Sequence, residues 1–260
     1  MAIVRRIHLP RAQLGPALGE LRALISLTAD QSRYLVSVLR LEPGELLEVF
    51  DGEGARYEAT LRAGLSATGE AWVELGKQLP NTTNSGAREV TLAQALAKAD
   101  KLELVIQKAT ELGCARVIPF AAERSIVKLD RLGDERGQAK VTRWRKIAEE
   151  AARQSGRADV PEIVTPMRWS DLFALVAQDP ELRAVALDPL ATSLRLGAAA
   201  LGAKKLLIAV GPEGGFSPEE LERAEANGFI RASLGSLILR TETAGLAALS
   251  VVQHLAGALG

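Results

Sequence analysis

Short hydrophobic segments separated by turn residues dominate the first 79 positions of the chain. One helical piece is expected near residues 29–40, and turns such as Asp51-Gly52-Glu53-Gly54 interrupt the rest. The segments typical of strands are residues 46–50, 55–61 and 70–75. Many short strands joined by tight turns predict a small β-barrel over residues 1–79.

A different pattern follows a polar, turn-rich stretch over residues 80–88, which we interpret as a linker. From residue 89 to residue 260, apolar runs alternate with segments of helical spacing, and Asp100 and Ser170 are expected to cap helices. The expected strands are residues 90–96, 116–120, 183–187 and 206–210. Strands and helices in this alternation predict an α/β domain with a parallel sheet.

A glycine-rich loop, residues 211–215 with the sequence Gly-Pro-Glu-Gly-Gly, separates the last of these strands from a helix. Glycines let the backbone turn sharply and approach a ligand at the carboxyl end of a strand. Ser217, Pro218 and Glu220 have the pattern of an N-cap, a first helical residue and a capping-box partner. Gly228 is expected to end this helix. A glycine cluster alone would more simply make a tight turn.

A second irregular loop, residues 234–244, has the sequence Leu-Gly-Ser-Leu-Ile-Leu-Arg-Thr-Glu-Thr-Ala. It follows a short strand expected at residues 230–234 and leads into an alanine- and leucine-rich final helix that ends near Leu255. Two neighbouring strands that each end in a glycine-containing loop favour a ligand crevice over two independent turns.

Composition and charge limit which partners and bound groups are expected for this chain. The formal net charge is zero, so a nucleic-acid partner would need a local basic surface. Cys114 is the only cysteine and His8 and His254 are the only histidines, so neither a disulfide nor a metal site is expected, and Cys114 is expected to be buried. No signal peptide or membrane span is visible, which predicts a cytoplasmic protein with no membrane partner.

The two glycine-containing loops together resemble the signature of the 16S ribosomal RNA (uracil-N3)-methyltransferases, the RsmE family of the SPOUT superfamily. The resemblance covers nearly the whole chain. One departure lies at Ser236 and Leu237, where members of the family usually carry Pro-Arg. Further blocks that agree in order are residues 38–44, 50–52, 92–96, 98–101, 103–113, 123–125 and 154–157.

This resemblance implies an α/β fold whose last strands and helix form a SPOUT-type trefoil knot, an arrangement that periodicity alone does not predict. It also implies that residues 1–79 are a PUA-like domain that helps to hold RNA. The implied cofactor is S-adenosylmethionine, and the implied acceptor is N3 of a specific uridine in 16S ribosomal RNA, as free RNA or within the 30S subunit. A homodimer is implied, and no metal is required.

The resemblance further implies a cofactor site made mostly of backbone groups, with leucine side chains packed on the adenine. Arg240 is expected to orient the target base or to stabilise its charge, and Glu213 or Glu242 is the weaker candidate for proton acceptor. Alternatively, Glu242 is a first-turn acid that pairs with Arg240. The expected cofactor-binding residues are Leu187, Gly211, Pro212, Glu213, Gly214, Gly215, Leu234, Gly235, Ser236, Leu239 and Thr241.

Residues 124–157 carry more lysines and arginines than acids and form the local basic segment of the chain. A solvated helix face with charge pairs would explain most of it. The polar residues at its two ends are typical of functional loops, and arginine can grip a phosphate with two hydrogen bonds. The expected RNA-binding residues are Arg124, Ser125, Arg153, Gln154 and Arg157.

Two other functions remain open at this point. An RNA-binding or ribosome-assembly module could keep the fold without efficient catalysis, and the change at Ser236 and Leu237 leaves room for it. A nucleotide-binding enzyme is disfavoured because the glycine loop lacks the lysine of a P-loop and the spacing of a dinucleotide-binding fingerprint.

Overall fold

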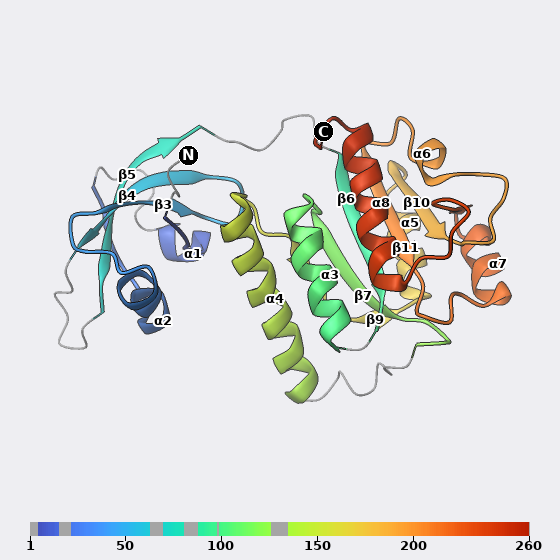
Figure 1. Ribbon diagram of the computed structural model, residues 1–260, viewed down its shortest axis with the longest axis horizontal. Coiled ribbons are helices and arrows are strands. Elements are labelled where there is room, and N and C mark those ends of the chain that lie inside the picture. Colours follow the sequence, from blue (N-terminus) through green and yellow to red (C-terminus); the bar gives the residue numbers. More distant parts are fainter. Residues whose placement is uncertain are drawn as a thin grey trace. The chain divides into compact units, whose positions relative to one another are not determined.

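The computed structural model describes residues 5–15, 22–62, 70–80, 88–97, 99–125 and 135–259. The chain forms two compact units (Figure 1). One comprises residues 1–83 and 152–160, and the other comprises residues 84–151 and 161–260. Most of the expected linker, residues 81–87, and Lys98 of the quoted block 98–101 lie outside the described residues.

The first unit is built on a curled sheet, for which the described residues supply five strands in the order β1-β3-β4-β5-β2. The expected helical piece is split into α2 (Ala29–Arg33) and one π-helical turn (Tyr34–Val38), and a short helix α1 (Arg11–Leu14) precedes it. Leucine and valine side chains fill the interior of the curl. The strands are β1 (Arg6–His8), β2 (Leu24–Ser26), β3 (Leu46–Phe50), β4 (Arg56–Arg62) and β5 (Trp72–Leu79).

Residues 152–160 belong to the first unit, whereas the division expected from the sequence placed them in the second domain. Arg6 is 7% exposed, and its Nη2 donates a hydrogen bond to the carbonyl oxygen of Arg157 at 3.0 Å. The amide of Val160 donates to the carbonyl oxygen of Gly52 at 2.9 Å. A buried guanidinium needs such acceptors, and only the folded chain brings them to it.

The second unit is built on a parallel sheet, for which the described residues supply seven strands. Their order along the main path is β12-β10-β11-β6-β7-β8, and β9 pairs with β7. The parallel sheet predicted from the sequence is therefore present, with strand ends within a few residues of those expected. The strands are β6 (Glu89–Ala95), β7 (Arg116–Ala121), β8 (Glu162–Ile163), β9 (Met167–Arg168), β10 (Leu182–Leu187), β11 (Lys205–Val210) and β12 (Phe229–Ala232).

Helices accompany this sheet, and the last of them crosses back from the edge strand β12 to pack on α3, β6 and β11 (Figure 1). This return path positions the loop before α8 beside the glycine-rich loop. The trefoil knot stays a prediction that rests on the family resemblance. The helices are α3 (Ala99–Glu111), α4 (Glu135–Ser155), α5 (Asp171–Gln178), α6 (Leu196–Ala199), α7 (Pro218–Ala226) and α8 (Thr241–Leu255).

Two of the expected helix caps are wrong in detail. Asp100 lies in the first turn of α3 and is not its N-cap. Ser170 occupies the N-cap position of α5, but its side chain makes no capping hydrogen bond. An acid in the first turn of a helix is favoured by the helix dipole. The sequence pattern therefore located both helices correctly, although it did not identify the hydrogen bonds at their first turns.

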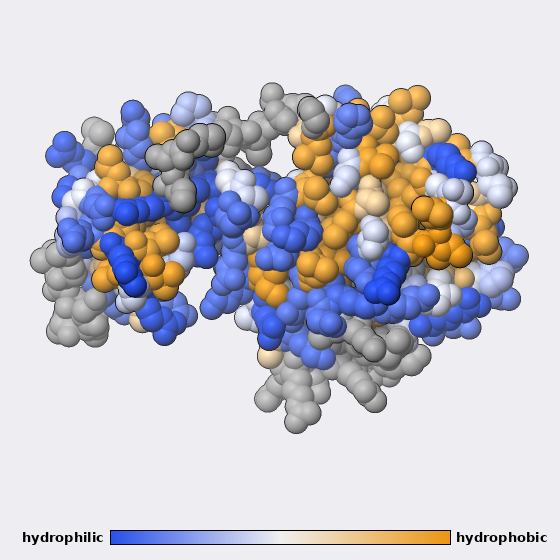
Figure 2. All heavy atoms as spheres, viewed as in Figure 1, coloured by the Kyte–Doolittle hydropathy of each residue, from blue (hydrophilic) through white to orange (hydrophobic). Residues whose placement is uncertain are grey.

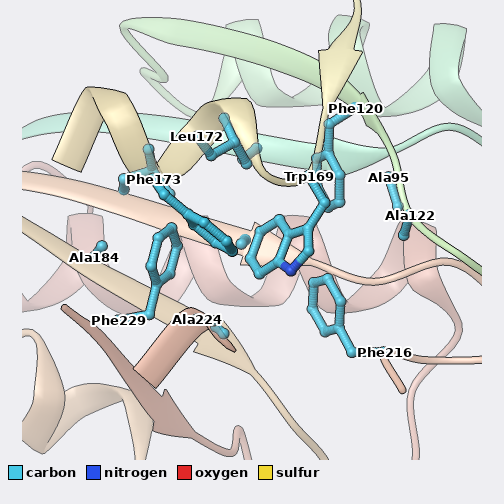
Figure 3. Packing of buried hydrophobic residues seen from close by; sticks show 14 of the residues in the cluster. Ala95, Phe120, Ala122, Trp169, Leu172, Phe173, Ala184, Phe216, Ala224 and Phe229 are labelled. Carbon is cyan, nitrogen blue, oxygen red and sulfur yellow. The ribbon is translucent and has the colours of Figure 1, made fainter. Parts of the chain in front are cut away.

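Aromatic side chains pack around Trp169 on one face of the sheet, as Figure 3 shows. The ring of Phe216, directly after the glycine-rich loop, lies 4.7 Å from that of Trp169 between centroids. Phe120 and Phe229 lie 5.1 and 5.2 Å from the same ring. Tilted pairs at these distances are favourable contacts, so the aromatic cluster holds the far end of the glycine-rich loop in place.

The predicted capping box at the start of α7 is confirmed. The amide of Glu220 donates to Ser217 Oγ at 3.2 Å, and the amide of Ser217 donates to Glu220 Oε2 at 2.9 Å. Glu220 Oε1 also accepts from the amide of Glu123 at 2.8 Å. One carboxylate therefore joins the helix start to the loop after β7.

Replacing Ser217 with alanine is expected to lower the free energy of unfolding by about 1 kcal/mol, because a capping hydrogen bond is lost. Ser170→Ala is the matched control, since Ser170 has the same position in α5 but makes no such bond. Its expected effect is below about 0.5 kcal/mol. Urea unfolding of both variants measures the difference, and equal losses would contradict the assignment.

Candidate functional site

A pocket of about 370 Å³ opens at the carboxyl ends of β10, β11 and β12. Parallel pairing aligns these ends, because Leu187 is in register with Val210 on one side and with Ala232 on the other. The loops that follow the three strands therefore leave the sheet at one level and face a common space. This is the edge at which open α/β sheets bind ligands.

Most of the expected cofactor-binding residues line this pocket. Three are the leucines Leu187, Leu234 and Leu239, which give it apolar walls. The others are Gly211, Pro212, Glu213, Gly215, Gly235 and Thr241.

Gly214 and Ser236 do not line the pocket. The carbonyl oxygen of Gly214 accepts a hydrogen bond from Arg124 Nη1 at 3.0 Å, so this peptide faces Arg124 instead. The side chains of Leu237 and Ile238 line the pocket in place of Ser236, although they are 76% and 81% exposed. The rim is therefore apolar at Leu237, one of the two positions at which the sequence departs from the pattern of the family that it resembles.

A cluster of three charged side chains forms at the pocket, and its centre, Lys101, was missed by the sequence analysis. Lys101 belongs to the first turn of α3, and its Nζ lies 3.1 Å from Glu213 Oε1 and 3.4 Å from Glu242 Oε2. The hydrogen bond to Glu213, followed by that to Glu242, raises the pKa of Lys101. The ammonium group therefore stays charged at neutral pH.

This cluster changes the expected pairing of Glu242. Glu242 lies in the first turn of α8, as expected, but its cation partner is Lys101 and not Arg240. Arg240 is exposed and lines the pocket, and its guanidinium makes no hydrogen bond or ion pair within the described part of the chain. Arg240 is thus free to interact with a ligand, whereas Glu242 does not line the pocket.

Asp188, at the end of β10, serves the structure around the pocket. It is 5% exposed, its Oδ1 accepts from the amide of Leu190 at 2.9 Å, and its Oδ2 pairs with Arg231 Nη2 at 2.7 Å. The bond to Asp188 raises the pKa of Arg231. These contacts make Asp188 a turn residue at the end of β10.

The expected RNA-binding residues are divided between the two units, since Arg124 and Ser125 belong to the second and the others to the first. Ser125 is 4% exposed, and its Oγ accepts from the amide of Ala122 at 3.0 Å, so its side chain stabilises a turn.

The three residues of the first unit have different surroundings. The guanidinium of Arg153 lies 3.9 Å from the ring centroid of Tyr34 in a cation–π contact, and the residue is partly exposed. Gln154 is exposed. Arg157 forms an ion pair with Asp159, which leaves it less able to bind RNA.

Neither a membrane span nor a metal cluster is found in the described parts of the chain. No helix there is long and apolar enough to cross a bilayer. No three His, Cys, Asp or Glu side chains among those residues are grouped so that they could hold a metal ion.

Comparison with protein families identifies the class of protein to which this chain belongs. Residues 84–253 match the model of the RNA methyltransferase domain, and residues 27–64 match that of the RNA methyltransferase PUA domain. The parallel sheet, the pocket at its carboxyl edge and the preceding curled sheet are thus those of a two-domain RNA methyltransferase.

Individual relatives make the assignment more specific. A Bacillus subtilis protein named ribosomal RNA small subunit methyltransferase E is 34% identical over 88% of this chain and 89% of its own length. The structure of a protein of the same name from Neisseria gonorrhoeae, bound to S-adenosylmethionine, is 29% identical with a TM-score of 0.82. A Legionella pneumophila methyltransferase in complex with S-adenosylmethionine is 31% identical with the same TM-score. Each structure covers 97% of this chain and is itself covered over 98% of its length.

This chain belongs to the ribosomal RNA small subunit methyltransferase E family. The family resemblance, the SPOUT-type fold and the PUA-like domain expected from the sequence are confirmed.

The ion cluster at Lys101 predicts a specific pH dependence of stability. A raised pKa in the folded state means that the contribution of the ammonium group is complete below the ordinary value of 10.5 and is lost as the pH rises through the raised value. The difference in unfolding free energy between the wild type and Lys101→Met should therefore be constant from about pH 7 to 9 and smaller above about pH 10.5. Urea unfolding across this range measures it, and a difference independent of pH would contradict the cluster.

Proposed function

We propose that this chain transfers the methyl group of S-adenosylmethionine to N3 of a uridine in the 16S ribosomal RNA of the small subunit. The observation that carries the proposal is the pocket at the carboxyl edge of the sheet, in a chain that belongs to a ribosomal RNA methyltransferase family. The target atom and nucleotide follow from the family resemblance. The acceptor is the RNA itself or the 30S subunit that contains it.

The residues of the pocket fit this cofactor. Leu187 from β10 and Leu234 and Leu239 after β12 offer an apolar surface suited to an adenine ring. Lys101 comes after β6 and Glu213 after β11, and the pair places both signs of charge in the pocket. When bound, S-adenosylmethionine supplies a methyl group that its positive sulfonium already activates for transfer.

The protein has two tasks at the acceptor base, to align it and to help N3 lose its proton. Arg240 supports the first task, because a free guanidinium at the pocket can hold a uracil carbonyl oxygen and stabilise the negative charge that develops there. Glu213 is the better placed of the two candidate proton acceptors, because it lines the pocket and Glu242 does not. Its Oε1 accepts from Lys101, which leaves Oε2 for the proton of N3.

A ribosome-assembly module without catalysis is the less favoured function. The glycine-rich loop and the loop over residues 234–240 both contribute to the pocket, so the change at Ser236 and Leu237 has not closed it. Two relatives of the same fold and similar length are bound to the cofactor.

A homodimer is part of the proposal. Figure 2 shows hydrophobic residues gathered over α8 and the loop before it. Large apolar side chains exposed there and on the loop after β10 are Leu190, Leu237, Ile238, Val251 and Leu255. Exposed apolar side chains in one region of a soluble domain are typical of a protein interface.

RNA contact is proposed for both units, through Arg124 in the second and Arg153 with Gln154 in the first. All three side chains are at least partly exposed. Arg124 lies directly beside the glycine-rich loop through its bond to Gly214, so a phosphate bound there would be close to the pocket.

Arg240→Ala is expected to lower the rate of methyl transfer to small-subunit RNA by about 100-fold or more, the usual effect of losing a charge-stabilising donor. Cofactor affinity should stay nearly unchanged, because Arg240 acts on the acceptor base. Methylation is measured as N3-methyluridine in digested 16S ribosomal RNA, and affinity by calorimetric titration with S-adenosylmethionine. Arg223→Ala, an exposed arginine on α7, is the control. Equal loss of rate and affinity would assign Arg240 to the pocket wall instead.

Replacing Arg124 and Arg153 with alanine should weaken RNA binding and also make it less dependent on salt. Each lost phosphate contact reduces the slope of log affinity against log salt concentration by about 0.7 to 0.9. Fluorescence anisotropy of a labelled RNA over a salt series measures this slope. Arg223→Ala should leave it unchanged, and an unchanged slope in the double variant would remove these arginines from the RNA interface.

A further inference from the structure

Three buried polar groups connect the elements that surround the pocket. Gln94 lies near the end of β6, Thr241 is the first residue of α8, and Gly211 opens the glycine-rich loop. Gln94 Nε2 donates a hydrogen bond to Thr241 Oγ1 at 2.8 Å, and Thr241 Oγ1 donates to the carbonyl oxygen of Gly211 at 2.6 Å. Gln94 is 1% exposed and Thr241 is 5% exposed. The chain of bonds therefore lies in the interior, immediately beneath the pocket wall.

The direction of these bonds is set by the single proton of the hydroxyl group. Since the Gly211 carbonyl can only accept, Thr241 must give it that proton and can then only accept from Gln94. The amide of Gln94 is thereby turned with its nitrogen toward Thr241 and its oxygen away. That oxygen, Oε1, accepts no hydrogen bond within the described part of the chain.

The unsatisfied oxygen faces α8 at Gly245. A Cβ atom added at Gly245 would lie 2.8 Å from Gln94 Oε1, closer than real contacts of this kind. The chain thus has a glycine in the middle of a helix and a buried acceptor without a donor, and both are unfavourable for stability. An apolar side chain at position 94 would avoid the second cost and lose the bond to Thr241, so the glutamine has little net advantage for stability alone.

The position of Gln94 indicates what the network achieves. Gln94 is in register with Val210, which is the residue before Gly211, and Val210 is in register with Leu187 on the pocket's apolar side. The glutamine therefore stands at the same level as the strand ends that carry the pocket. Through one hydroxyl it ties the start of the glycine-rich loop to the start of α8, where the second loop ends.

We propose that Gln94 is a positioning residue for the methyl donor. It holds the carbonyl of Gly211 and the first turn of α8 through the Thr241 hydroxyl, so that the two loops keep a fixed separation across the pocket. Thr241 likewise acts through this hydroxyl and does not use it to bind the cofactor. The proposal rests on the proposed function, because the ligand whose affinity depends on the network is S-adenosylmethionine.

The test compares cofactor affinity with stability in variants that remove one bond of the network. Gln94→Met keeps the length of the side chain and removes both amide groups. Its affinity for S-adenosylmethionine should fall by about five- to tenfold, as expected for one or two neutral hydrogen bonds. Its thermal unfolding temperature without cofactor should be equal to that of the wild type or higher, because the unsatisfied oxygen is gone. Calorimetric titration and thermal unfolding of the cofactor-free protein supply the two measurements.

Thr241 provides a matched pair that leaves β6 unchanged. Thr241→Val removes the hydroxyl at nearly constant shape and should weaken cofactor binding to the same extent. Thr241→Ser restores the hydroxyl and should bind within about twofold of the wild type. The double variant Gln94→Met, Thr241→Val should bind no more weakly than the weaker single variant, because both changes break the same chain of bonds.

The outcomes separate this inference from the function on which it rests. If the folded wild type does not bind S-adenosylmethionine, the proposed function fails and the inference fails with it. If the wild type binds and Gln94→Met and Thr241→Val bind equally well, the function stands and the positioning role is wrong. A third outcome is that every variant loses affinity and unfolds at a lower temperature, and that Thr241→Ser does not restore binding. In that case the network would only stabilise the fold, and the positioning role would be wrong.

Discussion

Parallel pairing of β12, β10, β11 and β6 is the constraint on which the rest of the site depends. Because all four strands run in the same direction and in register, their carboxyl ends reach one edge of the sheet together. Each strand is followed there by a loop or a helix start that contributes to the pocket. Segments more than 140 positions apart, such as Gln94 and Thr241, come into hydrogen-bond contact at this edge.

The two pocket loops are held by different kinds of interaction. Hydrophobic packing of Phe216 on Trp169 fixes the far end of the glycine-rich loop, and the carboxylate of Glu220 ties the following helix to the loop after β7. On the other side, the hydroxyl of Thr241 and the ammonium group of Lys101 join α8 to β6 and α3. The loop before α8 is thus held by directional polar contacts, and the glycine-rich loop is held mainly by packing behind the pocket.

Expectations drawn from local signals agreed with the structure when the interacting groups were neighbours in sequence. The capping box of Ser217 and Glu220 spans three residues. The strand at 206–210 is a continuous apolar run, and the strand at 46–50 is apolar except for Glu48. Expectations that depended on side-chain direction were less accurate. Gly214 faces Arg124, Ser125 is buried in a turn, and Arg157 is paired with Asp159, although their residue types suggested ligand contact.

The amino-acid sequence by itself determined the class of fold, the two glycine-containing loops and, through the family motifs, the methyltransferase assignment. These depend on periodicity and on short motifs, in which the residues that act together are close along the chain. Tertiary structure alone decided that Lys101 pairs with Glu213, which is 112 positions away, and that residues 152–160 join the first unit. Lys101 meets Glu213 only after the sheet has formed, because a partner so far along the chain leaves no signal in the sequence around either residue.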